Sequence, residues 1–204
     1  MICVLVACVF ILLPCSLSLA AAHLVLVRPL GTKLPRYVAL LRGVSPANLK
    51  MPDLKRCLEI AGYAKVKTVL SSGNVAFDSA SGSVAAIERR IEAALTKQLG
   101  RSFYTIVRSV EYLNDLIEAD PYADFDLPTD AKRVVTFARK LPSPKLPLPV
   151  ERDGAQILAA GSREAFSAYL PGPRGAVFME LIKATFGTEV TTRTWETVRK
   201  CAKA

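Results

Sequence analysis

The chain has 204 residues, of which 51% are hydrophobic, so it can bury a substantial core in one large domain or two small ones. Its 27 basic and 18 acidic residues give a net charge of +9, which suits an anionic ligand or nucleic acid as well as ordinary solubility. The one histidine, His23, lies in an apolar leader, so the body lacks Ser-His-Asp and Cys-His catalysis, HExxH zinc chemistry and any His-ligated metal.

The cysteines favour a reducing compartment. Cys3, Cys8 and Cys15 lie in the leader, which leaves Cys57 and Cys201 in the body without CxxC spacing. Neither a disulfide framework nor a metal cluster is indicated by that spacing, and no cofactor is predicted. This cysteine usage is typical of a cytoplasmic protein.

Residues 1–36 differ in composition from the rest and form the apolar leader. Residues 2–27 contain no acidic or basic side chain apart from His23. An over-extended gene start is the favoured interpretation, with the protein beginning shortly before Tyr37. A membrane anchor is one alternative, since the run is long enough to span a bilayer. A cleaved signal peptide is the other, although the expected basic n-region is absent.

The body begins with a pattern of elements in the order β-α-β-β-α-β. The expected elements are a strand over 36–43, a helix over 51–61, strands over 66–71 and 75–78, a helix over 83–100 and a strand over 103–107. The first helix is indicated by apolar residues spaced three and four apart, by Pro52 in its first turn and by Gly62 at its C-terminal cap. This order is that of the split βαβ or ferredoxin-like plait, with strand order 4-1-3-2.

The second half is predicted to be a second, degenerate plait. Its expected elements are a helix over 110–118, strands over 133–138, 155–160 and 165–170, a helix over 177–186 and a final helix capped by Thr194. Prolines over 141–150 exclude regular structure there. The sequence therefore predicts an α+β protein with a leader over 1–36, a plait over 37–108 and an α/β plait over 109–204.

One edge of the first sheet gathers the candidate binding residues. Arg42 and Gly43 end the first strand, and the turn that contains Ser72, Gly73 and Asn74 lies on the same edge. The first helix also begins there, and helix N-termini favour anions. Arg42 offers a bidentate guanidinium, and the serine and asparagine offer hydrogen bonds. An anion pocket is predicted at this edge.

The bland interpretation of each motif stays open, and Arg42 taken alone is more often a surface charge at the end of a strand. Gly73–Asn74 between two alternating strands is also a two-residue hairpin signal, with solvated serines beside it. Arg193 lies between hydroxyl residues and is the candidate to close the pocket from the second half. For Thr194 and Trp195, a helix cap followed by an anchoring tryptophan is favoured. Neither GxxxxGK[ST] nor GxGxxG occurs, so a nucleotide fingerprint is absent.

Four segments carry a resemblance to a known family: YVALLRGVSP, LKMPDLKRCLEIAGYAKVKTVLSSGNVAF, YLPG and FGTEVTTRTWETVRK. They resemble the bacterial "domain of unknown function 1697" family over about residues 37–201. The resemblance implies two tandem ferredoxin-like plaits in a bacterial, cytosolic protein, and no established activity. Two departures are Ser45–Asn48, where many members have glycine, and 141–149, where many members have a helix. The family's recurring residues correspond to Arg42, Gly43, Ser72, Gly73, Asn74, Thr192, Arg193, Trp195 and Thr197.

The leading hypothesis is a cytoplasmic protein that binds an anionic small molecule, such as a phosphorylated metabolite or nucleotide, at the edge of Arg42, Ser72 and Asn74. No general base accompanies this set, so a catalytic role is left open. One alternative is a nucleic-acid-binding module that uses the basic sheet of the plait. The other is a structural or oligomerising protein without a ligand. The sequence defines neither the ligand nor the oligomeric state.

Overall fold

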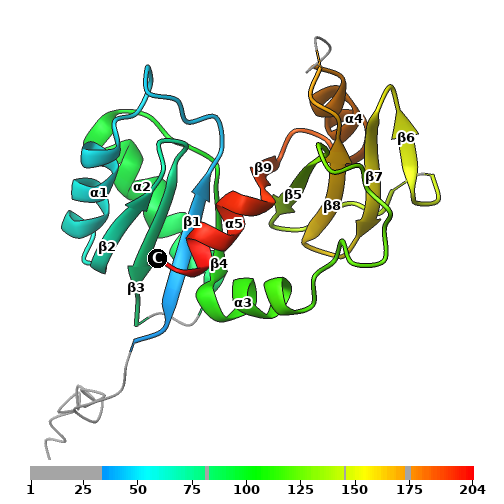
Figure 1. The fold of residues 1–204 in the computed structure, drawn as a ribbon. Helices are drawn as coiled ribbons and strands as arrows, with labels where there is room; N and C mark the ends of the chain where they lie inside the picture. Colours follow the sequence, from blue (N-terminus) through cyan, green and yellow to red (C-terminus); the bar gives the residue numbers. More distant parts are fainter. Residues whose placement is uncertain (1–33, 81–82, 145, 173–175) are drawn as a thin grey trace, which may run out of the picture. The chain divides into compact units, whose positions relative to one another are not determined.

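The computed structural model describes residues 34–80, 83–144, 146–172 and 176–204, so almost all of the predicted leader lies outside the described residues. Residues 34–204 form one compact unit with two antiparallel sheets, which confirms the predicted α+β class (Figure 1). Its elements are β1 (Arg36–Leu41), α1 (Met51–Ile60), β2 (Ala64–Val69), β3 (Asn74–Asp78), α2 (Val84–Leu99), β4 (Thr105–Ser109), α3 (Val110–Glu118), β5 (Lys132–Ala138), β6 (Val150–Arg152), β7 (Ala155–Ala160), β8 (Glu164–Tyr169), α4 (Ala176–Phe186), β9 (Val190–Thr194) and α5 (Trp195–Ala202). In the described part of the chain, no helix combines the length and apolarity needed to cross a membrane.

The first sheet has the strand order β2-β3-β1-β4, which is the order predicted from the βαββαβ pattern. All three of its strand pairs are antiparallel. Its helices begin and end as the sequence indicates. Gly62 follows α1 with a φ of +84°, and the N–H of Tyr63 donates to the carbonyl of Leu58 at 3.1 Å. Ser83 caps α2 by accepting from the N–H of Ala86.

The turn between β2 and β3 differs from the predicted two-residue hairpin. It contains four residues, Leu70 to Gly73, and Asn74 is already the first residue of β3. Leu70 (φ +58°) and Gly73 (φ +73°) have positive φ angles, so the conformation expected of Asn74 is adopted by Leu70 instead. A Cβ atom on Gly73 would lie 2.7 Å from the Cβ of Val44, so the turn packs too closely for any other residue.

The second sheet has the order β6-β7-β8-β5-β9. Without β6, this is the same order as the first sheet, with a proline-rich connection over 141–149 in place of the first crossover helix. Helix α4 packs on the outer face of the sheet through Phe178, Ile182 and Phe186. Strands β6 and β9 were not predicted. The β-branched run of β9 could have indicated a strand, but it was interpreted only as the approach to a helix cap.

A layer of two helices, α3 and α5, separates the sheets and binds them together (Figure 1). Leu113 of α3 and Trp195 of α5 belong to one core cluster with Leu40 of β1 and Phe137 of β5. Because α1 and α2 cover the other face of the first sheet, helices lie on both of its faces. Most of the sheet surface that the nucleic-acid alternative needs is therefore covered, and the exposed part is at the edge strand β2.

Candidate functional site

Arg193 joins the two sheets at the edge where the site was predicted. It lies in β9, and its guanidinium reaches the end of β1 and the β2–β3 turn. Its Nη2 donates to the carbonyl oxygens of Leu41 at 2.8 Å and Ser72 at 3.2 Å, and its Nε donates to Oδ1 of Asn74. The residue is only 9% exposed. Arg193 and Asn74, which are 119 positions apart in the sequence, are thus in direct contact.

The remaining donors of this pair are also occupied. Nη1 of Arg193 donates to Oγ1 of Thr191 and to the carbonyl of Thr192, each at 2.6 Å. Nδ2 of the fully buried Asn74 donates to the carbonyl of Val69 and to Oγ of Ser72, each at 3.0 Å. A guanidinium has five N–H donors and all of them have acceptors here. The geometry therefore assigns Arg193 and Asn74 to the junction between the sheets, and ligand binding by either one remains a prediction.

Arg42 lies at the same edge but its side chain is exposed. Its backbone N–H donates to the carbonyl of Tyr104 at 2.9 Å, which fixes the chain as it leaves β1. None of the ion pairs or side-chain hydrogen bonds found among the described residues involves the Arg42 guanidinium. It lines a cavity of about 330 Å³ whose other walls come from α4, the loop that follows it and the start of β9. These walls are Met179, Glu180, Ile182, Lys183, Gly187, Thr188 and Val190.

Of the predicted binding residues, only Arg42 lines this cavity. Gly43 has a φ of +71°, and its carbonyl accepts from Nδ2 of Asn48. Oδ1 of Asn48 also accepts from the N–H of Ser45. The loop Ser45–Asn48, which departs from the family pattern, is therefore held by its own hydrogen bonds. The N-terminus of α1 lines a separate hollow of about 270 Å³, beside Lys50 and Arg101. The predicted edge is thus divided into two hollows.

The residues predicted to be structural or adjacent to the site lie around α5. Thr194 caps this helix by accepting from the N–H of Thr197 at 3.3 Å, which confirms the favoured interpretation. The Trp195 ring is buried, with its centroid 5.3 Å from that of Tyr122. Thr192 lies next to the sulfur of Met179, a residue of the cavity wall.

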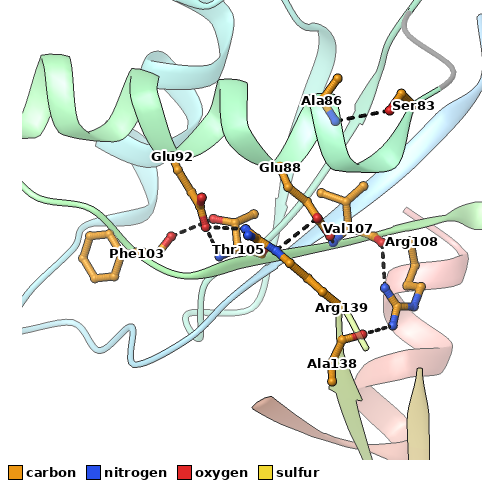
Figure 2. A network of polar contacts seen from close by, with 10 residues as sticks. All are labelled: Ser83, Ala86, Glu88, Glu92, Phe103, Thr105, Val107, Arg108, Ala138 and Arg139. Carbon is orange, nitrogen blue, oxygen red and sulfur yellow. Dashed lines mark hydrogen bonds and ion pairs between the residues drawn. The ribbon is translucent and has the colours of Figure 1, made fainter. Parts of the chain in front are cut away.

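A polar network that the sequence analysis missed connects α2 with the end of β5 (Figure 2). Glu88 is 3% exposed; its Oε1 accepts from the N–H of Val107 at 3.0 Å and its Oε2 lies 3.1 Å from Nε of Arg139. Oε1 of Glu92 accepts from Nη2 of Arg139 at 2.5 Å and from the N–H of Thr105 at 2.9 Å. Burial raises the pKa of Glu88, and Arg139 partly offsets that effect. One signal was available, because Glu88 falls within the apolar stripe of its helix.

Arg108 forms a second buried bridge beside this network (Figure 2). It is 1% exposed, and its Nη2 donates to the carbonyls of Ala138 at 2.6 Å and Arg163 at 2.9 Å. Burial lowers its pKa to about 10. Both bridges connect the first half with the second, and neither lines the Arg42 cavity. We therefore assign them to the fold. No group of three or more metal-ligating side chains occurs among the described residues.

Comparisons with known proteins agree with the resemblance carried by the sequence. The chain is similar in structure to the conserved bacterial protein SP0830 from Streptococcus pneumoniae, with a TM-score of 0.61 and 21% identity, over 84% of this chain and 98% of that one. At that identity the likeness shows the fold alone. No curated protein matches the sequence. The family described as "Protein of unknown function (DUF1697)" matches residues 34–166, which is more than half of the chain. The chain therefore belongs to the DUF1697 family.

Proposed function

We propose that this protein binds an anionic small molecule, such as a phosphorylated metabolite or a nucleotide, in the cavity lined by Arg42 and Lys183. The proposal rests mainly on Arg42. It follows the end of β1 and lines a cavity whose remaining walls belong to α4, the loop after it and the start of β9. Within the described residues, no carboxylate forms an ion pair with it. An arginine that no fold contact engages is available for a bidentate contact with phosphate or carboxylate.

The other walls of the cavity fit a phosphorylated metabolite. Lys183, on α4, adds a second positive charge to the lining of the cavity. Ile182, Met179 and Val190 give an apolar surface for a ring or a sugar face, as is usual in ligand sites. The carboxylate of Glu180 can accept hydrogen bonds from ligand hydroxyl groups. This mixture favours a ligand with an anionic end and a polar or ring-bearing body over a bare anion.

The proposal changes the roles expected of the other predicted residues. Ser72, Asn74 and Arg193 support the edge from which Arg42 projects, and they do not contact the ligand. A cytoplasmic location is part of the proposal and is supported by Cys57 and Cys201, both of which are buried free thiols. Catalysis is not part of it, because the cavity walls offer only Glu180 as a carboxylate and no partner activates it.

A thermal-shift screen of phosphorylated metabolites and nucleotides tests the proposal, with the wild type compared with Arg42→Ala. We expect at least one compound to raise the Tm of the wild type and not that of the variant, while the Tm without ligand stays the same. Arg56→Ala is the matched control, because Arg56 is an exposed arginine on α1 away from the cavity. Equal shifts in all three proteins, or no shift with any compound, would contradict the proposal.

The alternatives predict different results in the same assay. A nucleic-acid-binding protein would bind oligonucleotides with an affinity that falls steeply as salt rises. It would have to use a surface other than the central part of the first sheet, since helices cover that part on both faces. A structural or oligomerising protein would give no ligand response, and Asn74→Ala or Arg193→Ala would change its assembly.

A further inference from the structure

The positive charge of Arg193 has no ionised partner among the described residues. Each atom that accepts from its guanidinium is neutral: an amide oxygen of Asn74, a hydroxyl of Thr191 and three backbone carbonyls. Burial lowers the pKa of Arg193 to about 10. A buried charge without a counter-charge is costly even when dipoles surround it. The fold therefore retains an unbalanced charge at the junction between its sheets.

This charge lies next to the Arg42 cavity. The Leu41 carbonyl that accepts from Nη2 of Arg193 belongs to the residue before Arg42. Val190, at the start of the strand that carries Arg193, lines the cavity itself, from the opposite face of β9. The planar guanidinium also holds the carbonyls of Leu41 and Ser72 together, so it fixes the direction in which the chain leaves β1. Arg193 is thus able to act on the cavity both by charge and by position, without touching a ligand.

We propose that Arg193 is a positioning residue of the Arg42 cavity, and that the anionic group of the ligand supplies the counter-charge that the fold lacks. Ligand binding and the junction between the two sheets then stabilise each other, because coupling free energies are reciprocal. This inference rests on the proposed function for its ligand. The electrostatic effect of Arg193 on the cavity is tested without a ligand.

Two variants separate charge from position. Asn74→Asp is nearly isosteric and places a carboxylate against Nε of Arg193, so it neutralises the charge. It also removes the amide N–H groups that Asn74 donates to the carbonyl of Val69 and to Oγ of Ser72. Arg193→Lys keeps the charge but cannot form the planar set of hydrogen bonds. Asn114→Asp is the matched control, since it makes the same change of charge at an exposed position of α3. Circular dichroism establishes that each variant is folded.

The first measurement is the affinity of the full chain for inorganic phosphate and pyrophosphate, followed by NMR titration. We expect Asn74→Asp to weaken binding about threefold, the order of effect of cancelling one charge that acts on a solvated cavity without touching the ligand. Arg193→Lys should weaken it as much or more, because the planar guanidinium no longer holds the carbonyl of Leu41, the residue before Arg42. Asn114→Asp should leave the affinity unchanged.

The second measurement needs no ligand. In Thr188→Cys, a reporter thiol lines the cavity, and its pKa is measured from the pH dependence of alkylation of the tryptic peptide 184–193. Adding Asn74→Asp should raise the pKa of this thiol, since neutralising Arg193 removes stabilisation of the thiolate. Adding Asn114→Asp should not. Arg42, Lys183, Glu180 and Glu189 are the same in every variant, so the difference isolates Arg193.

The outcomes distinguish the two proposals. A reporter pKa that does not respond to Asn74→Asp overturns the role of Arg193, whatever the affinity for phosphate. Phosphate binding that neither Asn74→Asp nor Arg193→Lys weakens overturns it as well and leaves the proposed function intact. A wild type that binds no anion while the reporter responds contradicts the proposed function and the coupling to a ligand, but supports the electrostatic role of Arg193.

Discussion

Replacing Arg139 with methionine should expose how much the buried network between α2 and β5 contributes to stability. Arg139 lies 3.1 Å from Oε2 of Glu88 and 2.5 Å from Oε1 of Glu92, and it donates to the carbonyl of Thr105 at 2.9 Å. Its guanidinium also stacks on Tyr104, with 4.5 Å to the ring centroid. Methionine has a similar length and can keep part of that packing. The substitution therefore removes mainly the charge and its hydrogen bonds.

The loss of stability caused by Arg139→Met depends on which of the two carboxylates water can reach. Glu92 and Arg139 are 22% and 33% exposed in their side chains, so water replaces part of what Glu92 loses. The Glu88 side chain is 4% exposed, and it would keep only the N–H of Val107 as a partner. Leaving one buried carboxylate without its cation costs about 3 kcal/mol at pH 7. For a compact unit of this size, that corresponds to a fall in Tm of roughly 6–12 °C.

The loss should depend on pH in a defined direction. Burial already raises the pKa of Glu88 in the wild type, and loss of Arg139 should raise it further. A carboxyl whose pKa is raised by folding favours the folded state below its unfolded pKa, and this contribution is lost as pH rises through the folded pKa. The destabilisation by Arg139→Met should therefore be largest at pH 7 and should shrink toward pH 4.5, where Glu88 takes up a proton.

Urea unfolding at pH 7 and pH 4.5 measures the destabilisation at each pH. Unfolding is followed by the fluorescence of the single tryptophan, Trp195, which lies in the layer between the sheets. Adding Glu88→Gln to Arg139→Met should recover at least half of the lost stability at pH 7, because it removes the unpaired charge. Glu92→Gln in the same background is the control and should recover less. Equal losses at the two pH values, or no recovery with Glu88→Gln, would refute the electrostatic explanation.

Two further substitutions test local geometry by the same unfolding assay. Gly73→Ala should lower the free energy of unfolding by about 2–4 kcal/mol, because its Cβ would meet Val44 at 2.7 Å and its φ is +73°. Gly43→Ala, with a φ of +71° and open space around it, should lower it by only about 1 kcal/mol. Similar losses in the two variants would show that steric contact is not the cause. Thr194→Ala should cost about 1 kcal/mol through loss of the α5 cap, and Thr194→Ser should be nearly neutral; a large loss with serine would indicate a role for the threonine methyl group.

The elements of the first half could be predicted because local signals and topology agree there. Pro52, Gly62 and Ser83 mark helix ends through backbone geometry that depends on a few neighbouring residues. The strand order then follows from the order of the elements. The second half was harder because its first crossover is a proline-rich segment, and because β9 is an edge strand of only five residues that continues directly into a helix. Its short length and the adjacent cap signal concealed it.

The contacts of the site could not be predicted, because they join residues far apart in the sequence. Sequence reasoning brought Arg42, Asn74 and Arg193 to one edge, but it could not determine which atoms would be occupied. In the structure, Asn74 and Arg193 use their hydrogen-bonding groups on each other and on backbone carbonyls. Glu88 and Arg139 form an ion pair although they are 51 positions apart, and the sequence around either residue does not indicate its partner.

Fold contacts explain most of the residues that the family resemblance singles out. Gly73 is required because it packs closely against Val44. Asn74 and Arg193 form the junction between the sheets, and Trp195 belongs to the core between them. A residue with such a contact needs no ligand to account for it. Arg42 is different, because among the described residues its guanidinium has no hydrogen bond or ion pair, yet it faces a cavity that also contains Lys183. The proposed function therefore depends on Arg42, whose guanidinium is available to a ligand, and Arg42→Ala is its sharpest test.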